Sequence, residues 1–120
     1  NGKLINNLTN SPRVHDENGI YSPDGKKIIW NHGSGDPGSG EEVWMMDQDG
    51  SNKVRLTHFS KPGYSEYSPI ARQITESGWS PDGQMIVFGH VNDQRVNGLG
   101  IHLPADLYLL TFAGACGNTK

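Results

Sequence analysis

The sequence is poor in the residues that build disulfides, metal clusters and membrane spans. Cys116 is the single cysteine among 120 residues, so no internal disulfide can form, and neither a C-x-x-C zinc pair nor a C-x-x-C-H haem attachment sequence is present. No apolar run approaches the roughly 20 residues of a membrane-spanning helix, and no signal peptide is recognisable. We therefore expect no covalently attached haem, no cofactor and no insertion into a membrane.

Charge is also scarce, and its balance is slightly negative. Charged residues make up 19% of the chain, and the formal net charge is -3. Proteins that bind nucleic acid or anionic membranes do so through a basic surface, so we expect neither as a partner. Only 33% of the residues are hydrophobic, whereas 16 glycines and 7 prolines divide the chain into short apolar runs. This pattern is typical of an all-β protein.

What the sequence does contain is a repeat. The stretch "GIYSPDGKKIIWNH" at 19–32 returns as "GWSPDGQMIVFGH" at 78–90. Three landmarks recur in the same order: Leu8-Thr9 as Leu56-Thr57, Ser22-Pro23-Asp24-Gly25 as Ser80-Pro81-Asp82-Gly83, and Val43-Trp44-Met45-Met46 as Leu107-Tyr108-Leu109-Leu110. The separation of the landmarks grows along the chain because the second copy has longer loops. Insertions that fall only between fixed segments are typical of a repeat architecture.

Each copy predicts a set of antiparallel strands. A short strand ("GIYS" or "GWS") leads into a Ser-Pro-Asp-Gly turn, whose glycine accepts a left-handed conformation. A second strand ("KKIIW" or "QMIVF") and a third ("EVWMMD" or "DLYLLT") follow. In the first copy Asp49-Gly50 predicts a hairpin into a fourth strand that ends "VRLT". Four-stranded units that repeat every 40 to 60 residues predict blades of a β-propeller.

These segments resemble a known repeat family. "YSPDGKKIIW … EVWMMDQDGSNKVRLT" and "WSPDGQMIVF … DLYLLT" are similar to the WD40-like repeats of TolB-type propellers, also called PD40 repeats, and the likeness covers nearly the whole chain outside the loops. The resemblance implies an interaction platform outside the cytoplasm, either periplasmic or extracellular. It also implies that the partners are other protein chains.

The predicted fold is all-β, with about two consecutive four-stranded antiparallel blades of a larger propeller. Residues 1–9 are expected to form the outer strand of a preceding blade, 10–57 a complete blade, and 58–120 a second blade that lacks its outermost strand. Propellers close with four to eight blades, so the remainder of the ring is expected from other parts of the same propeller or from other protein chains. Closure by identical copies is the less favoured alternative.

The long loops are expected at one end of the blades, because successive turns alternate between the two ends. Long loops on a rigid scaffold commonly carry binding sites. Tyr64, Tyr67 and Arg72 occupy no repeat position, and both residue types are favoured binding anchors. With Asp93 and Arg95 they form the predicted partner-binding set. The alternative is that the loop of 58–76 packs on the surface of its own propeller.

All five histidines are expected at the same end. His32 and His90 occupy equivalent repeat positions, and together with His102 they are the candidate ligands of a metal or haem, provided that they converge. The simpler interpretation is that His32 and His90 bond to loop backbone at the ends of strands.

The predicted function is that of a non-catalytic module that binds or scaffolds proteins through its long-loop face. One alternative is an accessory or gating propeller of a larger, prolyl-oligopeptidase-like enzyme. Another is a metal- or haem-associated propeller in a redox assembly. The sequence "GWSPDG" resembles a nucleophile elbow, but Pro81 follows the serine, so Ser80 is predicted to be a turn residue and the segment not to be an enzyme.

Overall fold

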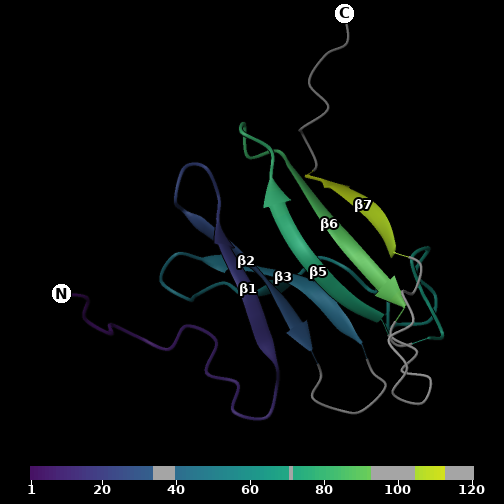
Figure 1. Ribbon diagram of the computed structural model, residues 1–120, viewed down its shortest axis with the longest axis horizontal. Helices are drawn as coiled ribbons and strands as arrows, with labels where there is room; N and C mark the ends of the chain where they lie inside the picture. Colours follow the sequence, from purple (N-terminus) through teal and green to yellow (C-terminus); the bar gives the residue numbers. More distant parts are fainter. Residues whose placement is uncertain (34–39, 71, 93–104, 113–120) are drawn as a thin grey trace, which may run out of the picture.

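The computed structural model describes residues 1–33, 40–70, 72–92 and 105–112, which form two antiparallel sheets (Figure 1). The first sheet has four strands in chain order: β1 (Asp16–Tyr21), β2 (Lys27–Gly33), β3 (Glu41–Asp47) and β4 (Val54–Arg55). The second has three: β5 (Arg72–Trp79), β6 (Met85–Asn92) and β7 (Ala105–Thr111). The described part of the chain contains no helix, and so none that is long and apolar enough to cross a membrane.

The all-β, antiparallel prediction is confirmed, whereas a closed ring is not present in the described residues. The fourth strand of the first sheet is shorter than "VRLT" suggests, because only Val54 and Arg55 pair with β3. One further hydrogen bond extends this pairing, from Leu56 N to Val43 O at 2.8 Å. Residues 1–9 form no strand, and their assignment to a preceding blade stays a prediction.

Both Ser-Pro-Asp-Gly segments form the same turn, as predicted. In the first, Gly25 has φ +72° and donates its N–H to Ser22 O at 2.8 Å. The Ser22 hydroxyl accepts the N–H of Lys27 at 2.9 Å and donates to Asp24 Oδ1 at 2.7 Å. In the second turn the same roles fall to Ser80, Asp82, Gly83 and Met85. The turn is therefore closed by hydrogen bonds within six residues, independently of the rest of the fold.

The core lies between the two sheets. Its buried apolar side chains come from both sheets and from the connection between them: Ile29, Val43, Phe59, Ile74, Ile86 and Phe88. Polar groups cross the same interface at a β-bulge that interrupts the β5–β6 ladder after Ile74. Asn31 Nδ2 donates to Ile74 O at 2.9 Å and to Thr75 O at 3.2 Å, and Glu41 Oε2 accepts Ile74 N at 2.8 Å. These bonds satisfy backbone groups that would otherwise be buried without partners.

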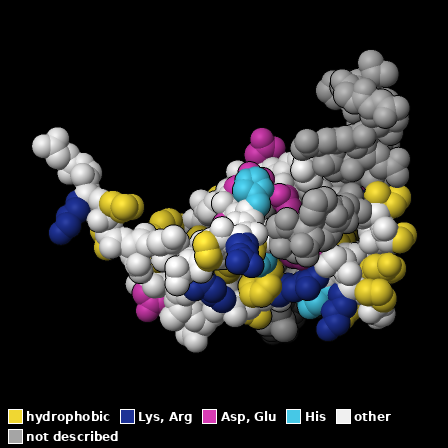
Figure 2. Space-filling model, turned by 90° about the horizontal axis from the view of Figure 1, so that it is seen from below, with side chains coloured by type: hydrophobic (Ala, Val, Ile, Leu, Met, Phe, Trp, Pro, Cys, Tyr) yellow, Lys and Arg dark blue, Asp and Glu magenta, His cyan; other side chains and the backbone are white. Residues whose placement is uncertain are grey.

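The outward faces of the two sheets differ. Ile28, Trp30 and Met46 form a second buried cluster on the outer face of the first sheet, and Leu8 packs against it. On the outer face of the second sheet, Leu107 is 81% exposed and Leu109 is 64% exposed. Hydrophobic side chains gather in Figure 2 on the side of the molecule where Figure 1 places β7. Within the part of the chain that the structure describes, the second sheet thus presents an exposed apolar face.

The hydrogen bonds of the turn indicate that its serine contributes measurably to the stability of the fold. Ser22→Ala removes the acceptor of the Lys27 N–H at a buried position, so we expect the free energy of unfolding to fall by about 1 kcal/mol in urea denaturation. The matched control is Ser77→Ala, because the buried Ser77 hydroxyl has no hydrogen-bond partner among the described residues and its loss should be neutral or stabilising. Equal destabilisation by both variants would contradict this account of the turn.

Candidate functional site

The first predicted metal ligand, His32, forms a hydrogen-bonded pair with Asp16. Its Nδ1 lies 2.7 Å from Asp16 Oδ1, which also accepts the indole N–H of Trp30 at 2.8 Å. Burial raises the pKa of Asp16, but hydrogen bonds from Ser11, His32 and Trp30 outweigh it and hold that pKa below its usual value. His32 is therefore held within the first sheet by a carboxylate, and no bond from its ring to loop backbone is seen among the described residues.

The second, His90, is fully buried at the interface between the sheets. Its ring stacks on Phe59 at a centroid distance of 3.8 Å and meets Tyr108 edge-on at 5.4 Å. Its Nδ1 lies 3.3 Å from a guanidinium nitrogen of Arg72, which can only donate, so Nδ1 is the acceptor and the proton sits on Nε2. Burial, reinforced by the charge of Arg72, lowers the pKa of His90 to about 4. His90 is thus a neutral core residue at pH 7.

Among the described residues, these two imidazoles have no contact in common, and His102 lies outside that part of the chain. The described side chains close enough to share a metal ion are instead His15, Glu17 and Glu41, whose ligand atoms lie within 4.8 Å of one another. Glu41 already accepts the Ile74 N–H across the sheet interface. Through this bond Glu41 contributes to the packing of the two sheets, and clusters that include exposed acidic groups are common without an ion.

A buried carboxylate, Glu42, organises the chain between the sheets. Its Oε2 accepts the Thr57 hydroxyl at 2.6 Å and the Phe59 N–H at 3.0 Å. Its Oε1 accepts the N–H of Ser60 at 2.8 Å and pairs with the guanidinium of Arg55. Residues 55–60 therefore wrap around one carboxylate, which is satisfied by charged and neutral donors together. Sequence analysis missed this role because nothing in the pattern distinguishes Glu42 from its neighbour Glu41.

The segment that follows, residues 58–70, is here named the tyrosine loop. It closes on itself: Glu66 Oε1 accepts the His58 N–H at 3.1 Å, and the His58 ring stacks flat on Tyr64 with centroids 3.9 Å apart. The Ser68 N–H donates to Phe59 O at 2.8 Å. Tyr64 and Tyr67 nevertheless remain 41% and 40% exposed. The loop thus leaves both tyrosine rings partly exposed at the surface, with the ring of Tyr64 held by its stacking on His58.

The remaining predicted binding residues differ from the two tyrosines. Arg72 is tied to its surroundings by hydrogen bonds to the Ser68 hydroxyl at 3.0 Å and to His90, and it lies 3.9 Å from Asp106. It links the tyrosine loop to the second sheet rather than standing free as an anchor. Asp93 and Arg95 lie outside the described residues.

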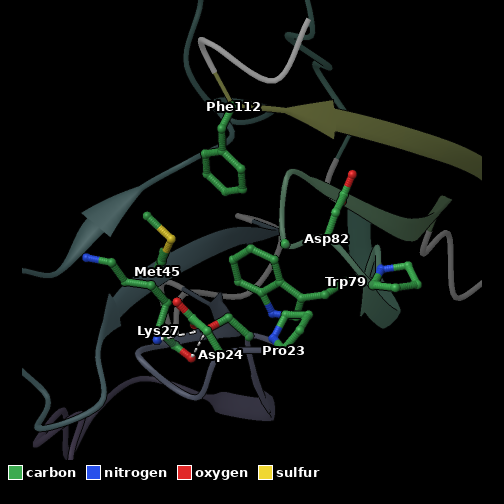
Figure 3. A pocket seen from close by; sticks show the side chains of 10 residues that line it. Pro23, Asp24, Lys27, Met45, Trp79, Asp82 and Phe112 are labelled. Carbon is green, nitrogen blue, oxygen red and sulfur yellow. Dashed lines mark hydrogen bonds between the residues drawn. The ribbon is translucent and has the colours of Figure 1, made fainter. Parts of the chain in front are cut away.

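A cavity of about 500 Å³ opens at the other end of the molecule, between the two Ser-Pro-Asp-Gly turns (Figure 3). Trp79 and Phe112 stack in it with their ring centroids 5.7 Å apart. Its polar groups are engaged: Asp24 accepts hydrogen bonds inside its own turn, and Lys27 pairs with Asp47. We interpret this cavity as the open end of the seam between the sheets.

Replacing the buried carboxylate should release the tyrosine loop. Glu42→Gln turns one acceptor oxygen into an amide that faces donors, so we expect a loss of about 3 kcal/mol in unfolding free energy. Chymotryptic cleavage after Tyr64 and Tyr67 in the folded protein should accelerate at the same time. The control is Glu76→Gln, an exposed residue of β5, which should leave both quantities unchanged. An unaltered cleavage rate in Glu42→Gln would show that other contacts hold the loop.

Stability should depend on pH through His90. Its pKa is lowered in the folded state to about 4, from an ordinary value of 6.5, so the unfolded chain binds the proton more readily as the pH falls. The neutral His90 therefore makes its full contribution to the free energy of unfolding above pH 6.5. This contribution, on the order of 3 kcal/mol, is lost as the pH falls from 6.5 to 4. Urea denaturation of wild type and His90→Asn across this range measures it, since carboxylates titrate in both proteins. Parallel pH profiles would contradict the prediction.

No protein-family model, no curated protein and no solved structure matches the chain. We therefore infer function from the contacts and exposures of the described residues.

Proposed function

We propose that this chain is a non-catalytic segment of a β-propeller that binds another protein through the tyrosine loop. The segment follows the pattern of the TolB-type repeats that its sequence resembles, with the four-stranded sheet as one blade and the three-stranded sheet as an incomplete second blade. On this proposal the two sheets are the rigid scaffold, and the loop that connects them carries the contact surface.

The observation that carries the proposal is a loop that is both fixed and exposed. Binding costs free energy when flexible side chains and loops are ordered at an interface, and a preorganised loop reduces that cost. The Glu42 and Glu66 hydrogen bonds fix the tyrosine loop before any partner arrives. Tyr64 and Tyr67 then offer large amphipathic rings that have few rotatable bonds, which is the character of binding anchors.

Repetition between the two sheets supports the propeller part of the proposal. Both carry the same turn, and both have a β-bulge in their first strand pair, within one residue of the equivalent position. The second sheet packs face to face on the first, as successive blades do. The apolar outer face at Leu107 and Leu109 is what a following blade would cover.

The test compares tyrosines at the two ends of the molecule. Proteins cross-linked to the immobilised chain are identified by mass spectrometry, and the affinity of each is measured with purified components. We expect Tyr64→Ala/Tyr67→Ala to weaken a genuine partner at least 30-fold, because the truncation of one anchor costs about 2 kcal/mol.

The matched control is Tyr21→Ala, which removes an exposed tyrosine beside the first turn, at the opposite end of the strands. It should leave the affinity unchanged. Circular dichroism and thermal melting confirm that each variant is folded. Equal affinity of the wild type and the double variant for every partner recovered would remove the tyrosine loop as the binding surface.

A further inference from the structure

Among the described residues, the outer edge of β7 has no partner strand, unlike the edge of β3 in the first sheet. In the first sheet β4 pairs with β3 on the side away from β2. In the second sheet β7 pairs with β6, and no other described strand lies on its free side. A free strand edge offers a row of unpaired N–H and C=O groups that another extended segment can use.

A segment of matching pattern is present at the start of this sequence. Residues 2–9 ("GKLINNLT") align with residues 50–57 ("GSNKVRLT"), the segment that contains β4. They form no strand here, and Leu4 and Ile5 are 91% and 92% exposed. In Figure 1 the N-terminus and β7 lie on opposite sides of the molecule, so residues 2–9 are poorly placed to reach β7 of the same chain.

We propose that residues 2–9 of one copy add to β7 of a second copy as the fourth strand of its second sheet. The inference rests on the blade repeat within the proposed function, but it is independent of the tyrosine loop. A second copy is chosen as the donor because its residues 2–9 carry the required pattern and its residues 2–7 are exposed.

The internal repeat fixes the register of the added strand. In the first sheet Val54 pairs with Met45 and Arg55 with Trp44. Transferring these pairs to the equivalent positions places Asn6 opposite Leu109 and Asn7 opposite Tyr108. The hydrogen bond from Leu56 N to Val43 O becomes one from Leu8 N to Leu107 O of the second copy.

Side-chain chemistry agrees with this register. In the first sheet the Thr57 hydroxyl accepts Val43 N and donates to the Glu42 carboxylate. The equivalent residues are Thr9 of the donor and Asp106 of the acceptor. Asp106 is exposed in the single chain, so its carboxylate is accessible to an incoming hydroxyl.

The apolar faces agree as well. Between the sheets of one chain, Ile86, Phe88, Tyr108 and Leu110 of the second sheet belong to the cluster that contains Ile29, Val43 and Met45 of the first. In the repeat, the outer-face residues of the first sheet that correspond to Ile86, Phe88, Tyr108 and Leu110 are Ile28, Trp30, Trp44 and Met46. The outer-face residues of the second sheet that correspond to Ile29, Val43 and Met45 are Val87, Leu107 and Leu109. Both of these equivalent sets lie on outer faces. Docking the first sheet of one copy on the second sheet of another therefore repeats the packing already present within the chain.

The test is a disulfide between copies in the predicted register, in a Cys116→Ser background. Two separately tagged single-cysteine proteins, Asn6→Cys and Leu109→Cys, are mixed and oxidised mildly. Directly opposed residues of antiparallel strands have Cα atoms about 4.5–5.5 Å apart, which suits a disulfide. We expect the mixed disulfide to form at least tenfold faster than in the control mixture of Leu4→Cys and Leu109→Cys, which is two residues out of register.

Sedimentation of the wild-type chain over a range of concentrations gives an independent measurement. We expect association that is lost in Leu109→Asp and kept in Val54→Asp, a control at an exposed residue of β4. Equal cross-linking in the two mixtures, or a wild-type chain that stays monomeric throughout, would overturn the inference. Tyr64→Ala/Tyr67→Ala should cross-link like the parent, so a failure of the tyrosine loop as a binding surface is distinguishable from a failure here.

Discussion

The meeting of the two sheets at Ile74 is the constraint on which the rest of the structure depends. A β-bulge interrupts the β5–β6 ladder immediately after this residue, and Asn31 and Glu41 of the first sheet bond to the C=O and N–H of Ile74. Burial of apolar side chains alone would allow the sheets to slide, whereas these directional bonds fix one relative position. The relative position of the sheets sets the distance that the residues between β4 and β5 must span. Hydrogen bonds to Glu42 fix the first residues of this connection.

Local features of this fold could be predicted from the sequence, because their causes lie within a few residues. The Ser-Pro-Asp-Gly turn needs only its own hydroxyl, carboxylate and glycine, and both copies form it as expected. The strands next to it follow from short apolar runs between turns. The role of Glu42 could not be predicted in this way, because it depends on five donor groups that lie 13 to 18 residues further along the chain.

The two equivalent histidines show how a repeat can mislead when its neighbours differ. His32 lies opposite Asp16 in the β1–β2 ladder, and the carboxylate gives its ring a hydrogen-bonding partner. At the corresponding place in the second copy His90 lies opposite Ile74, so the same residue type is enclosed by apolar and aromatic groups and stays neutral. The repeat conserves the position of the backbone, whereas the cross-strand partner decides what the side chain does.

The difference between the outer faces has a consequence for any assembly of these chains. A two-fold axis brings identical surfaces together, so it cannot match the face of Leu107 and Leu109 with the face of Trp30 and Met46. An assembly that covers both faces has to be polar, with every copy pointing in the same direction around or along it. Such an assembly closes into a ring only if the rotations between successive copies add up to a full turn. Otherwise it continues as a helical filament.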